Sequence, residues 1–219
     1  LFFALIYRPP PEDADAASRR EPLTVAAVAG LLRQPWMRNA IVAGLALVSA
    51  QYGILTWLML DLRDHTHIAL TRGAFFLALA QAAGAIGRIA LAAWSDRTPA
   101  LRFRLLTLSM IAIAAGVLVL MVTPSRTPEP ALAVLATWLG FFGLGWYGPW
   151  VAYLAETAPA DKVGLTLGAA MAINQLGIIA APPLLGLVHD LTGSYAALWA
   201  CVVGVHGVAY GLTGMTRQR

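Results

Sequence analysis

The sequence has little charge and almost no cysteine. Only 12% of its 219 residues are charged, whereas an ordinary soluble domain is about a quarter charged, and 59% are hydrophobic. This composition excludes a soluble domain with a normal polar surface, and it excludes a disordered chain. The 15 basic residues give a net charge of only +4 and lie between apolar runs, so they form no continuous face for nucleic acid. We conclude that the chain is an integral membrane protein.

The single cysteine, Cys201, excludes an intramolecular disulfide and a cysteine-based metal site. It lies inside an apolar run, where we expect a buried side chain. His65 and His67 lie in a predicted loop without a third ligand nearby, so we predict no metal and no cofactor. Enzyme motifs are missing from the sequence as well: it has no His-Glu-x-x-His segment, no Gly-x-Ser-Gly context and no Gly-x-x-x-x-Gly-Lys-Ser/Thr loop. We therefore expect a protein that is not an enzyme.

Long apolar runs dominate what is present. A helix needs roughly 20 apolar residues to cross a bilayer core about 30 Å thick. Six segments meet this length, and the short breaks between them carry turn residues, so consecutive helices should be antiparallel neighbours. We predict an all-α polytopic membrane bundle with six transmembrane helices at about residues 37–60, 72–94, 104–123, 131–154, 164–188 and 195–215.

Positive charge is divided unequally between the two sides of this predicted bundle. One side holds only Arg63, Arg72 and Arg126. The positive-inside rule therefore assigns the other side to the cytoplasm. We expect a multi-pass protein of the cell inner membrane (plasma membrane) with both ends cytoplasmic. The basic residues on the cytoplasmic side are Arg8, Arg19, Arg20, Arg33, Arg38, Arg97, Arg102, Arg104, Lys162, Arg217 and Arg219.

The chain before the first span divides into two parts. Residues 1–7 are apolar, with no basic flank and no cleavage site, so we predict the end of a transmembrane helix whose beginning is missing; the sequence would then be a fragment. In residues 8–35, a flexible linker at 9–22 precedes a segment with helical spacing at 23–33. We expect this segment to be a short helix along the membrane surface, or else an extended start of the first span.

Polar side chains inside the spans mark a candidate pocket, because polar groups are costly at membrane depth. They share helical faces in the first, second and fourth spans and lie near the middle of the fifth. The third and sixth spans have few polar groups and should face lipid. The fourth span is also rich in glycine before Pro149, which indicates a bend. The candidate pocket residues are Gln51, Tyr52, Gln81, Arg88, Trp146, Tyr147, Trp150, Asn174 and Gln175.

Several of these residues have a structural alternative. Trp and Tyr near span ends commonly form an interfacial belt, although Trp146, Tyr147 and Trp150 lie deeper. Asn174 and Gln175 are equally suited to an interhelical hydrogen bond worth about 1 kcal/mol. We expect His206, in the sixth span, to be a packing residue rather than a proton carrier.

Arg88 is the one basic residue well inside a predicted span. An arginine at the centre of a membrane helix costs roughly 2.5–3.5 kcal/mol on insertion scales. No acidic residue lies within one turn of it on the same helix. Three interpretations remain: its side chain extends to the cytoplasmic surface, it pairs with an acid elsewhere, or it binds an anionic substrate through its planar guanidinium.

These motifs resemble the C-terminal six-helix half of the major facilitator superfamily. Gly87-Arg88-Ile89 through Trp94-Ser95-Asp96-Arg97 resembles the superfamily's cytoplasmic loop motif after the eighth helix, although Thr98-Pro99-Ala100 separates it from Arg102 and Arg104. Two further segments resemble the end of the tenth helix and the eleventh helix with its exit: Glu156-Thr157-Ala158-Pro159 with Gly164, and Gly168, Asn174, Gly177, Pro182-Pro183, Gly186, Asp190 and Thr192-Gly193.

The resemblance implies a domain organisation. Residues 1–7 would end the sixth helix, 8–35 would be the central cytoplasmic loop, and 36–219 would be the C-terminal transmembrane domain. The partner would be a missing N-terminal six-helix half, with a substrate site between the halves near the midplane. Asp96, Arg97 and Glu156 would form a cytoplasmic gate by a charge network, and the first and fourth spans would line the cavity.

The function that follows is secondary active transport of a small solute by alternating access. Arg88 resembles the anion-binding arginine of oxalate and monocarboxylate carriers in this superfamily, so a mono- or dicarboxylate is the expected substrate. Export or uptake of a hydrophobic drug or a neutral metabolite is the alternative, because the fourth span is rich in tryptophan. A channel or an intramembrane enzyme is a third class, which the missing motifs and asymmetric polar faces disfavour. The coupling ion and the direction of transport stay open.

Overall fold

The computed structural model describes residues 25–215, and within this range every regular element is helical. Our expectations for residues 1–7 and for the linker at 9–22 fall outside the described residues. The elements are α3 (Val25–Leu32), α4 (Pro35–Thr66), α5 (Leu70–Arg97), η1 (Pro99–Leu101), α6 (Arg102–Met121), α7 (Glu129–Gly145), α8 (Tyr147–Thr157), α9 (Val163–Thr192) and α10 (Tyr195–Met215).

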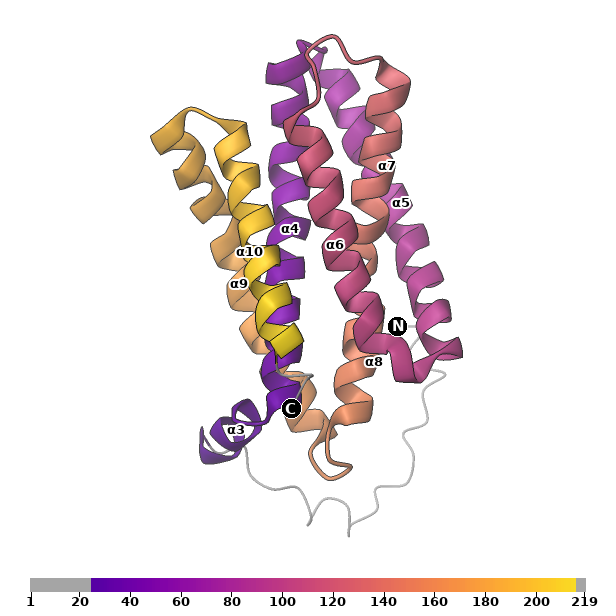
Figure 1. The fold of residues 1–219 in the computed structure, drawn as a ribbon, viewed down its shortest axis with the longest axis vertical. Coiled ribbons are helices and arrows are strands. Elements are labelled where there is room, and N and C mark those ends of the chain that lie inside the picture. Colours follow the sequence, from indigo (N-terminus) through magenta and orange to yellow (C-terminus); the bar gives the residue numbers. More distant parts are fainter. Residues whose placement is uncertain (1–24, 216–219) are drawn as a thin grey trace, which may run out of the picture.

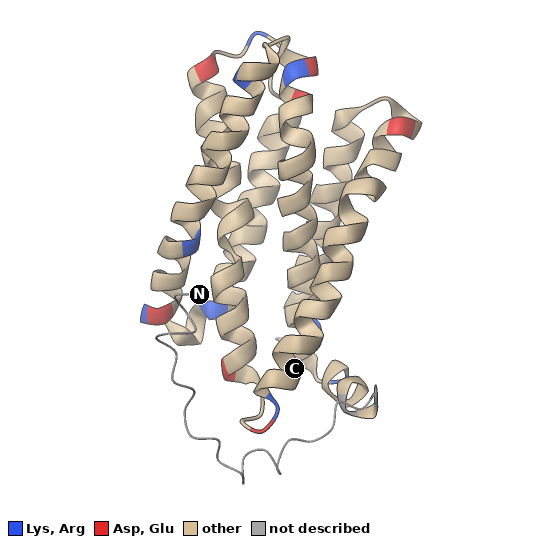
Figure 2. Ribbon diagram, turned by 180° about the vertical axis from the view of Figure 1, so that it is seen from behind, with Lys and Arg blue, Asp and Glu red and all other residues tan. Residues whose placement is uncertain are grey.

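Six membrane-length helical segments run along the long axis of the molecule, which confirms the predicted all-α polytopic bundle (Figure 1). Charged residues gather at the two ends of this bundle, as expected for helices with an apolar middle (Figure 2). The segments are Pro35–Thr66, Leu70–Arg97, Pro99–Met121, Glu129–Thr157, Val163–Thr192 and Tyr195–Gly214. Each overlaps one predicted span, and the first, second, fourth and fifth continue at least three residues past their predicted C-terminal ends, because their polar last turns stay helical.

The short helix α3 lies within the segment 23–33 where helical spacing predicted it. It packs against α4 and α9 at one end of the bundle (Figure 1). Gln34, with an extended backbone, separates it from α4, whose first residue is Pro35. Proline favours the first helical position and disfavours helix in the residue before it, so the chain changes direction there. α3 is therefore a separate helix and not an extension of the first span.

The fourth span is broken at Trp146, between α7 and α8, within the glycine-rich segment where we predicted a bend. The glycines of α7 also have a packing role. α5 and α7 form the most extensive helix pair of the bundle. A Cβ on Gly140 would overlap the backbone carbonyl of Ala80, and one on Gly87 would overlap the carbonyl of Phe141. Small residues thus bring the two backbones into contact, as in other membrane helix pairs.

The predicted lipid-facing character of the third and sixth spans holds for only one face of each. On α6, Ile111 and Leu118 are exposed, but Ile113 and Val117 are fully buried. The membrane-length segments differ in the burial of their most apolar 18-residue stretch. In the third segment (η1 with α6) 56% of that stretch is buried, whereas in the fifth segment (α9) only 17% is buried. The third span is therefore a core element here. Cys201 on α10 is exposed, which corrects our expectation of a buried thiol.

Candidate functional site

A cavity of about 320 Å³ lies among α4, α5, α8 and α9. It brings together seven of the nine residues that helical spacing selected as a pocket, from four helices that are far apart in the sequence. These are Gln51 and Tyr52 of α4, Arg88 of α5, Trp146 at the α7–α8 break, Tyr147 of α8, and Asn174 and Gln175 of α9. Val48, Met171 and Ile178 complete the lining with apolar surface.

Arg88 reaches this cavity because the fourth span is broken beside it. Its Nε donates a hydrogen bond to the backbone oxygen of Leu144 at 3.0 Å. Leu144 lies in the last turn of α7, where carbonyl groups lack their usual helical donors. This bond fixes the plane of the guanidinium. Within residues 25–215, neither terminal nitrogen of Arg88 has a hydrogen bond or an ion pair, so the four N–H groups of the two terminal nitrogens remain available.

The cavity wall next to Arg88 is held by an indole–amide contact. Trp146 is 1% exposed, and its Nε1 donates to Oε1 of Gln51 at 3.0 Å, which joins the broken fourth span to α4. The amide nitrogen of Gln51 keeps its donors. Tyr147 is 39% exposed and packs edge-on against Trp146, with 5.6 Å between ring centroids. The rings of Trp146 and Tyr147 and the amide nitrogen of Gln51 therefore line the same cavity.

The α9 side of the cavity offers two amides with different burial. Asn174 is 5% exposed, and its Oδ1 is buried without a hydrogen-bond partner in the described chain. Gln175 is exposed. A buried amide oxygen without a partner costs free energy, so it favours a donor brought by water or a ligand. The interhelical hydrogen bond that was the alternative for Asn174 Oδ1 is not formed among the described residues.

Two predicted pocket residues do not line the cavity. Trp150 is fully buried, and its Nε1 donates to the backbone oxygen of Ala40 at 2.8 Å, so it is a core residue that joins α8 to α4. The spacing of four residues predicts that Trp150 points to the same side as Trp146. This prediction is wrong because Trp146 lies at the helix break, so the two side chains do not follow one continuous helix. Gln81 is exposed, two turns from Arg88 on α5, and lies outside the cavity.

The predicted charge network at the end of α5 exists, but its central cation differs. Arg102, at the start of α6, lies 3.1 Å from Asp96 and 2.9 Å from Glu156 through its two terminal nitrogens. Its side chain is only 9% exposed, whereas those of Asp96 and Glu156 are more than half exposed. Arg97 is exposed and forms no ion pair within the described part of the chain. Arg102 was missed because η1 inserts a turn that redirects it towards both acids.

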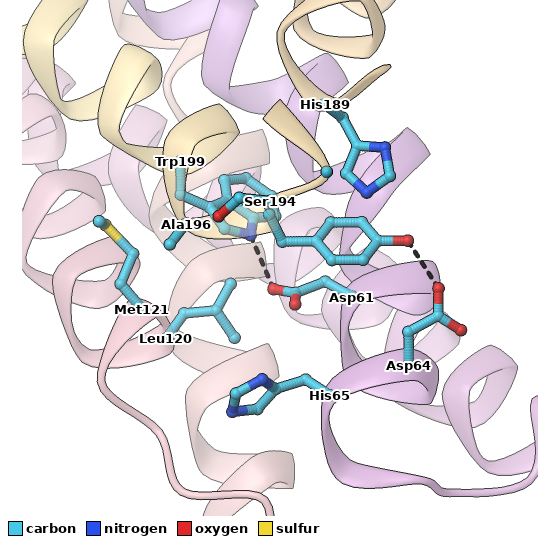
Figure 3. A pocket seen from close by; sticks show the side chains of 11 residues that line it. Asp61, Asp64, His65, Leu120, Met121, His189, Ser194, Ala196 and Trp199 are labelled. Carbon is cyan, nitrogen blue, oxygen red and sulfur yellow. Dashed lines mark hydrogen bonds between the residues drawn. The ribbon is translucent and has the colours of Figure 1, made fainter. Parts of the chain in front are cut away.

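A second cavity, of about 540 Å³, lies near the opposite end of the bundle, where α4 ends beside the α9–α10 connection (Figure 3). Its most buried ionisable group is Asp61, which is 6% exposed. The predicted first span ends at about residue 60, which places Asp61 outside it, and the structure corrects this bound. α4 continues to Thr66, so Asp61 lies more than a turn inside the helix. The sequence carries one signal for this position, because His65 follows Asp61 by four residues and therefore shares its helical face.

Neither cavity is arranged as a metal site. Among residues 25–215, no group of three or more His, Cys, Asp or Glu side chains is placed to hold a metal ion. His65 Nε2 lies 2.7 Å from the backbone oxygen of Thr123, and His67 is the left-handed residue that ends α4. The two histidines that we considered as a pair thus have separate structural roles.

Six membrane-length helices, four of which line a polar cavity with one arginine, define a polytopic membrane protein of the transporter class. The family model of the Major Facilitator Superfamily matches residues 1–182, and the chain therefore belongs to this superfamily of transporters. No curated protein matches the chain significantly. Family membership makes the protein a multi-pass membrane transporter of a small molecule, and it leaves the substrate open.

Proposed function

We propose that the protein is a secondary active transporter, a symporter or an antiporter, that moves a small organic anion such as a mono- or dicarboxylate by alternating access. Transport would involve no covalent chemistry. The observation that carries the proposal is the position of Arg88: its guanidinium lines a cavity of solute size together with polar side chains from three other helical segments.

The geometry of Arg88 suits a carboxylate. Its Nε is engaged by Leu144, which orients the guanidinium plane, while the terminal nitrogens are without partners in the described chain. Two parallel N–H groups match the two oxygens of a carboxylate, and a charge-assisted pair of this kind is about twice as strong as a neutral one. The hydrogen bond to the carbonyl of Leu144 holds the Arg88 side chain in place without a carboxylate partner. Because that carbonyl is neutral, the positive charge of the guanidinium is left for a ligand.

The rest of the lining suits a small ligand with one charged end. A volume of about 320 Å³ falls within the usual range of small-molecule sites, which combine apolar walls with few polar anchors. Trp146 and Met171 would contact the apolar part of the substrate. Gln51, Tyr52 and Asn174 would hydrogen-bond to its polar atoms.

We propose that a second set of six helices, in an N-terminal half, completes this cavity. The cavity lies beside α9, the least buried of the six segments, and α5 is also largely exposed. The exposed side of these helices carries Gln81, Gln175 and Arg88. Polar groups facing hydrocarbon are costly, which favours a protein neighbour on this side and lipid on the α6–α10 side.

The Arg102 network would be the cytoplasmic gate, and both ends of the chain would be cytoplasmic. The distribution of basic residues supports this orientation, because Arg33, Arg38, Arg97 and Arg104 belong to the same end of the bundle as Arg102. Arg102 would join the α5–α6 turn to the end of α8 only while the cytoplasmic side is closed. The membrane would be the cell inner membrane.

The experiment is an uptake screen with the full-length protein in proteoliposomes. Radiolabelled mono- and dicarboxylates and their neutral amide analogues are compared for the wild type, Arg88→Gln and Arg72→Gln. Arg72 is a matched control, since it lies on the same helix but pairs with Glu129 at 3.4 Å on the exposed end. We expect uptake of at least one carboxylate, lost in Arg88→Gln and kept in Arg72→Gln. Uptake of the neutral analogues alone would reject the anion proposal.

A hydrophobic drug or neutral metabolite is the second candidate substrate. The observation in its favour is the apolar part of the lining, where Val48, Met171 and Ile178 lie beside the buried ring of Trp146. The two candidates differ in their dependence on Arg88. Transport of a neutral compound would survive Arg88→Gln and would fall when Trp146 is replaced by alanine.

A further inference from the structure

The second cavity contains a buried carboxyl group that the proposed substrate site does not use. It is formed by the end of α4, the end of α6, and the connection between α9 and α10. α4 and α5 are antiparallel neighbours, so Asp61, near the end of α4, lies at the opposite end of the bundle from Asp96 at the end of α5. The cavity is therefore on the side that the proposed orientation places outside the cell.

Asp61 has only one hydrogen-bond partner in the described chain, and that partner is neutral. Trp199 Nε1 donates to its Oδ2 at 2.7 Å (Figure 3). The other oxygen, Oδ1, has no partner within residues 25–215. The residue is 6% exposed, and no cation within this range lies close enough for an ion pair. A buried carboxylate without a counter-charge is costly, and binding a proton removes that cost.

Asp64, one turn further along α4, has the opposite environment. Its Oδ1 accepts from Arg63 Nε at 2.6 Å, and its Oδ2 accepts from the hydroxyl of Tyr195 at 2.8 Å. Its side chain is 41% exposed. Asp64 is thus neutralised by a cation, has both oxygens satisfied and lies in contact with solvent, so it has no reason to take up a proton. The two acids of one cavity are electrostatically distinct.

Two imidazoles line the same cavity and are more exposed than Asp61: His65 is exposed, and the side chain of His189 is 26% exposed. His65 Nε2 lies 2.7 Å from the carbonyl of Thr123, which can only accept, so Nε2 carries the hydrogen and Nδ1 is left to bind a proton. His189 of α9 packs against Tyr195 with 4.3 Å between ring centroids and a tilted ring plane. The titratable groups that face Asp61 are therefore Asp64, His65, His189 and Tyr195, while α6 presents only Leu120 and Met121.

We infer that Asp61 is the proton-binding site of this transporter, loaded from the second cavity, which His65 and His189 also line. A proton passes from cavity water to Oδ1 of Asp61, the carboxylate becomes a neutral carboxyl group, and Trp199 remains bonded to Oδ2 in both forms. Because α4 lines both cavities, the charge state of Asp61 affects the helix that also carries Gln51 and Tyr52. The coupling of this proton to transport rests on the proposed function.

The first test measures the proton without any substrate. Infrared difference spectra between acid and alkaline pH are recorded on the full-length protein in lipid, for the wild type, Asp61→Asn and Asp64→Asn. Asn keeps the shape of Asp and an oxygen for Trp199, so the fold is expected to persist. We expect a band of a protonated, weakly hydrogen-bonded carboxyl group in the wild type and Asp64→Asn, and its loss in Asp61→Asn. Equal spectra in all three proteins would overturn the inference.

The second test separates the inference from the proposed function. The carboxylate found in the uptake screen is followed in proteoliposomes in two modes: accumulation driven by a pH gradient, and exchange at equal pH. We expect Asp61→Asn to lose accumulation at least tenfold while keeping exchange, and Asp64→Asn to keep both. Accumulation that persists in Asp61→Asn overturns the proton site, whereas a wild type that fails in both modes rejects the proposed carboxylate transport and leaves the infrared result to decide the site.

Discussion

Identical side chains in this protein have different roles according to their hydrogen-bond acceptor. Trp146 and Trp150 are one helical turn apart, and both are buried. Trp146 donates to a side chain, Gln51, and lines a cavity, whereas Trp150 donates to the backbone of Ala40 and fixes α8 against α4. The sequence predicts both as pocket residues, because spacing reports a helix face and does not report which neighbour covers it.

Replacing Trp150 should therefore destabilise the protein without changing substrate selectivity. Trp150→Phe leaves the carbonyl of Ala40 without its indole donor in a dry site, which costs about 1–3 kcal/mol. Thermal unfolding in detergent measures the effect, and Trp94→Phe is the control, since Trp94 is 48% exposed. Equal melting temperatures for the two variants would contradict the assignment of Trp150 to the core.

At the scale of elements, the contact between α5 and α7 depends on glycine. The positions of Gly87 and Gly140 leave no room for a methyl group, because each faces the backbone of the other helix. By contrast, a Cβ at Gly204 of α10 would meet nothing within 4 Å. Glycines in membrane helices thus separate into those that allow close approach and those that lie on an open surface.

Gly140→Ala and Gly204→Ala should consequently differ in stability. The first variant must separate α5 from α7 and displace Arg88 from Leu144, whereas the second adds a methyl group on an open face. We expect Gly140→Ala to lower the melting temperature of the reconstituted protein and its yield from membranes, with Gly204→Ala close to the wild type. Two equally stable variants would contradict the close packing of α5 on α7.

How far the sequence predicts the site is shown by three residues. Arg88 was found because a lone cation at membrane depth is conspicuous in any sequence. Arg102 was assigned to a basic cluster and not to the network, because its direction depends on the 3-10 turn η1 that precedes α6. Asp61 was missed because its burial comes from α10 and the end of α6, which approach it only in the folded bundle. Helices and their faces are local properties, while contacts between helices are not.

For the whole molecule, charge is separated into two clusters at opposite ends of the bundle. The Arg102 network joins α5, α6 and α8 at one end, and the Asp61 cavity joins α4, α6, α9 and α10 at the other. The cavity with Arg88 lies among four of the same helices. This arrangement fits a cycle in which one end opens while the other closes around a central substrate site.

Reversing one charge of the Arg102 network should change the balance between the two open states. Asp96→Lys places a cation beside Arg102, whose side chain is 9% exposed, so the closed cytoplasmic end is destabilised. Engineered cysteines at both ends, in a Cys201→Ser background, should become more accessible from the cytoplasm and less accessible from outside. Arg97→Gln serves as the control. Unchanged accessibility in Asp96→Lys would reject the gate.

If Arg88 binds the charged end of the substrate, the affinity for the carboxylate identified by uptake depends on its guanidinium. The dissociation constant is measured by calorimetry on the purified full-length protein for the wild type, Arg88→Lys and Arg88→Gln. Loss of charge-assisted hydrogen bonds worth about 1.5–3 kcal/mol predicts a Kd about 10- to 150-fold higher in Arg88→Gln. Arg88→Lys should bind more weakly than the wild type as well, because an ammonium lacks the two-pronged geometry. A wild-type Kd in Arg88→Gln would contradict the account.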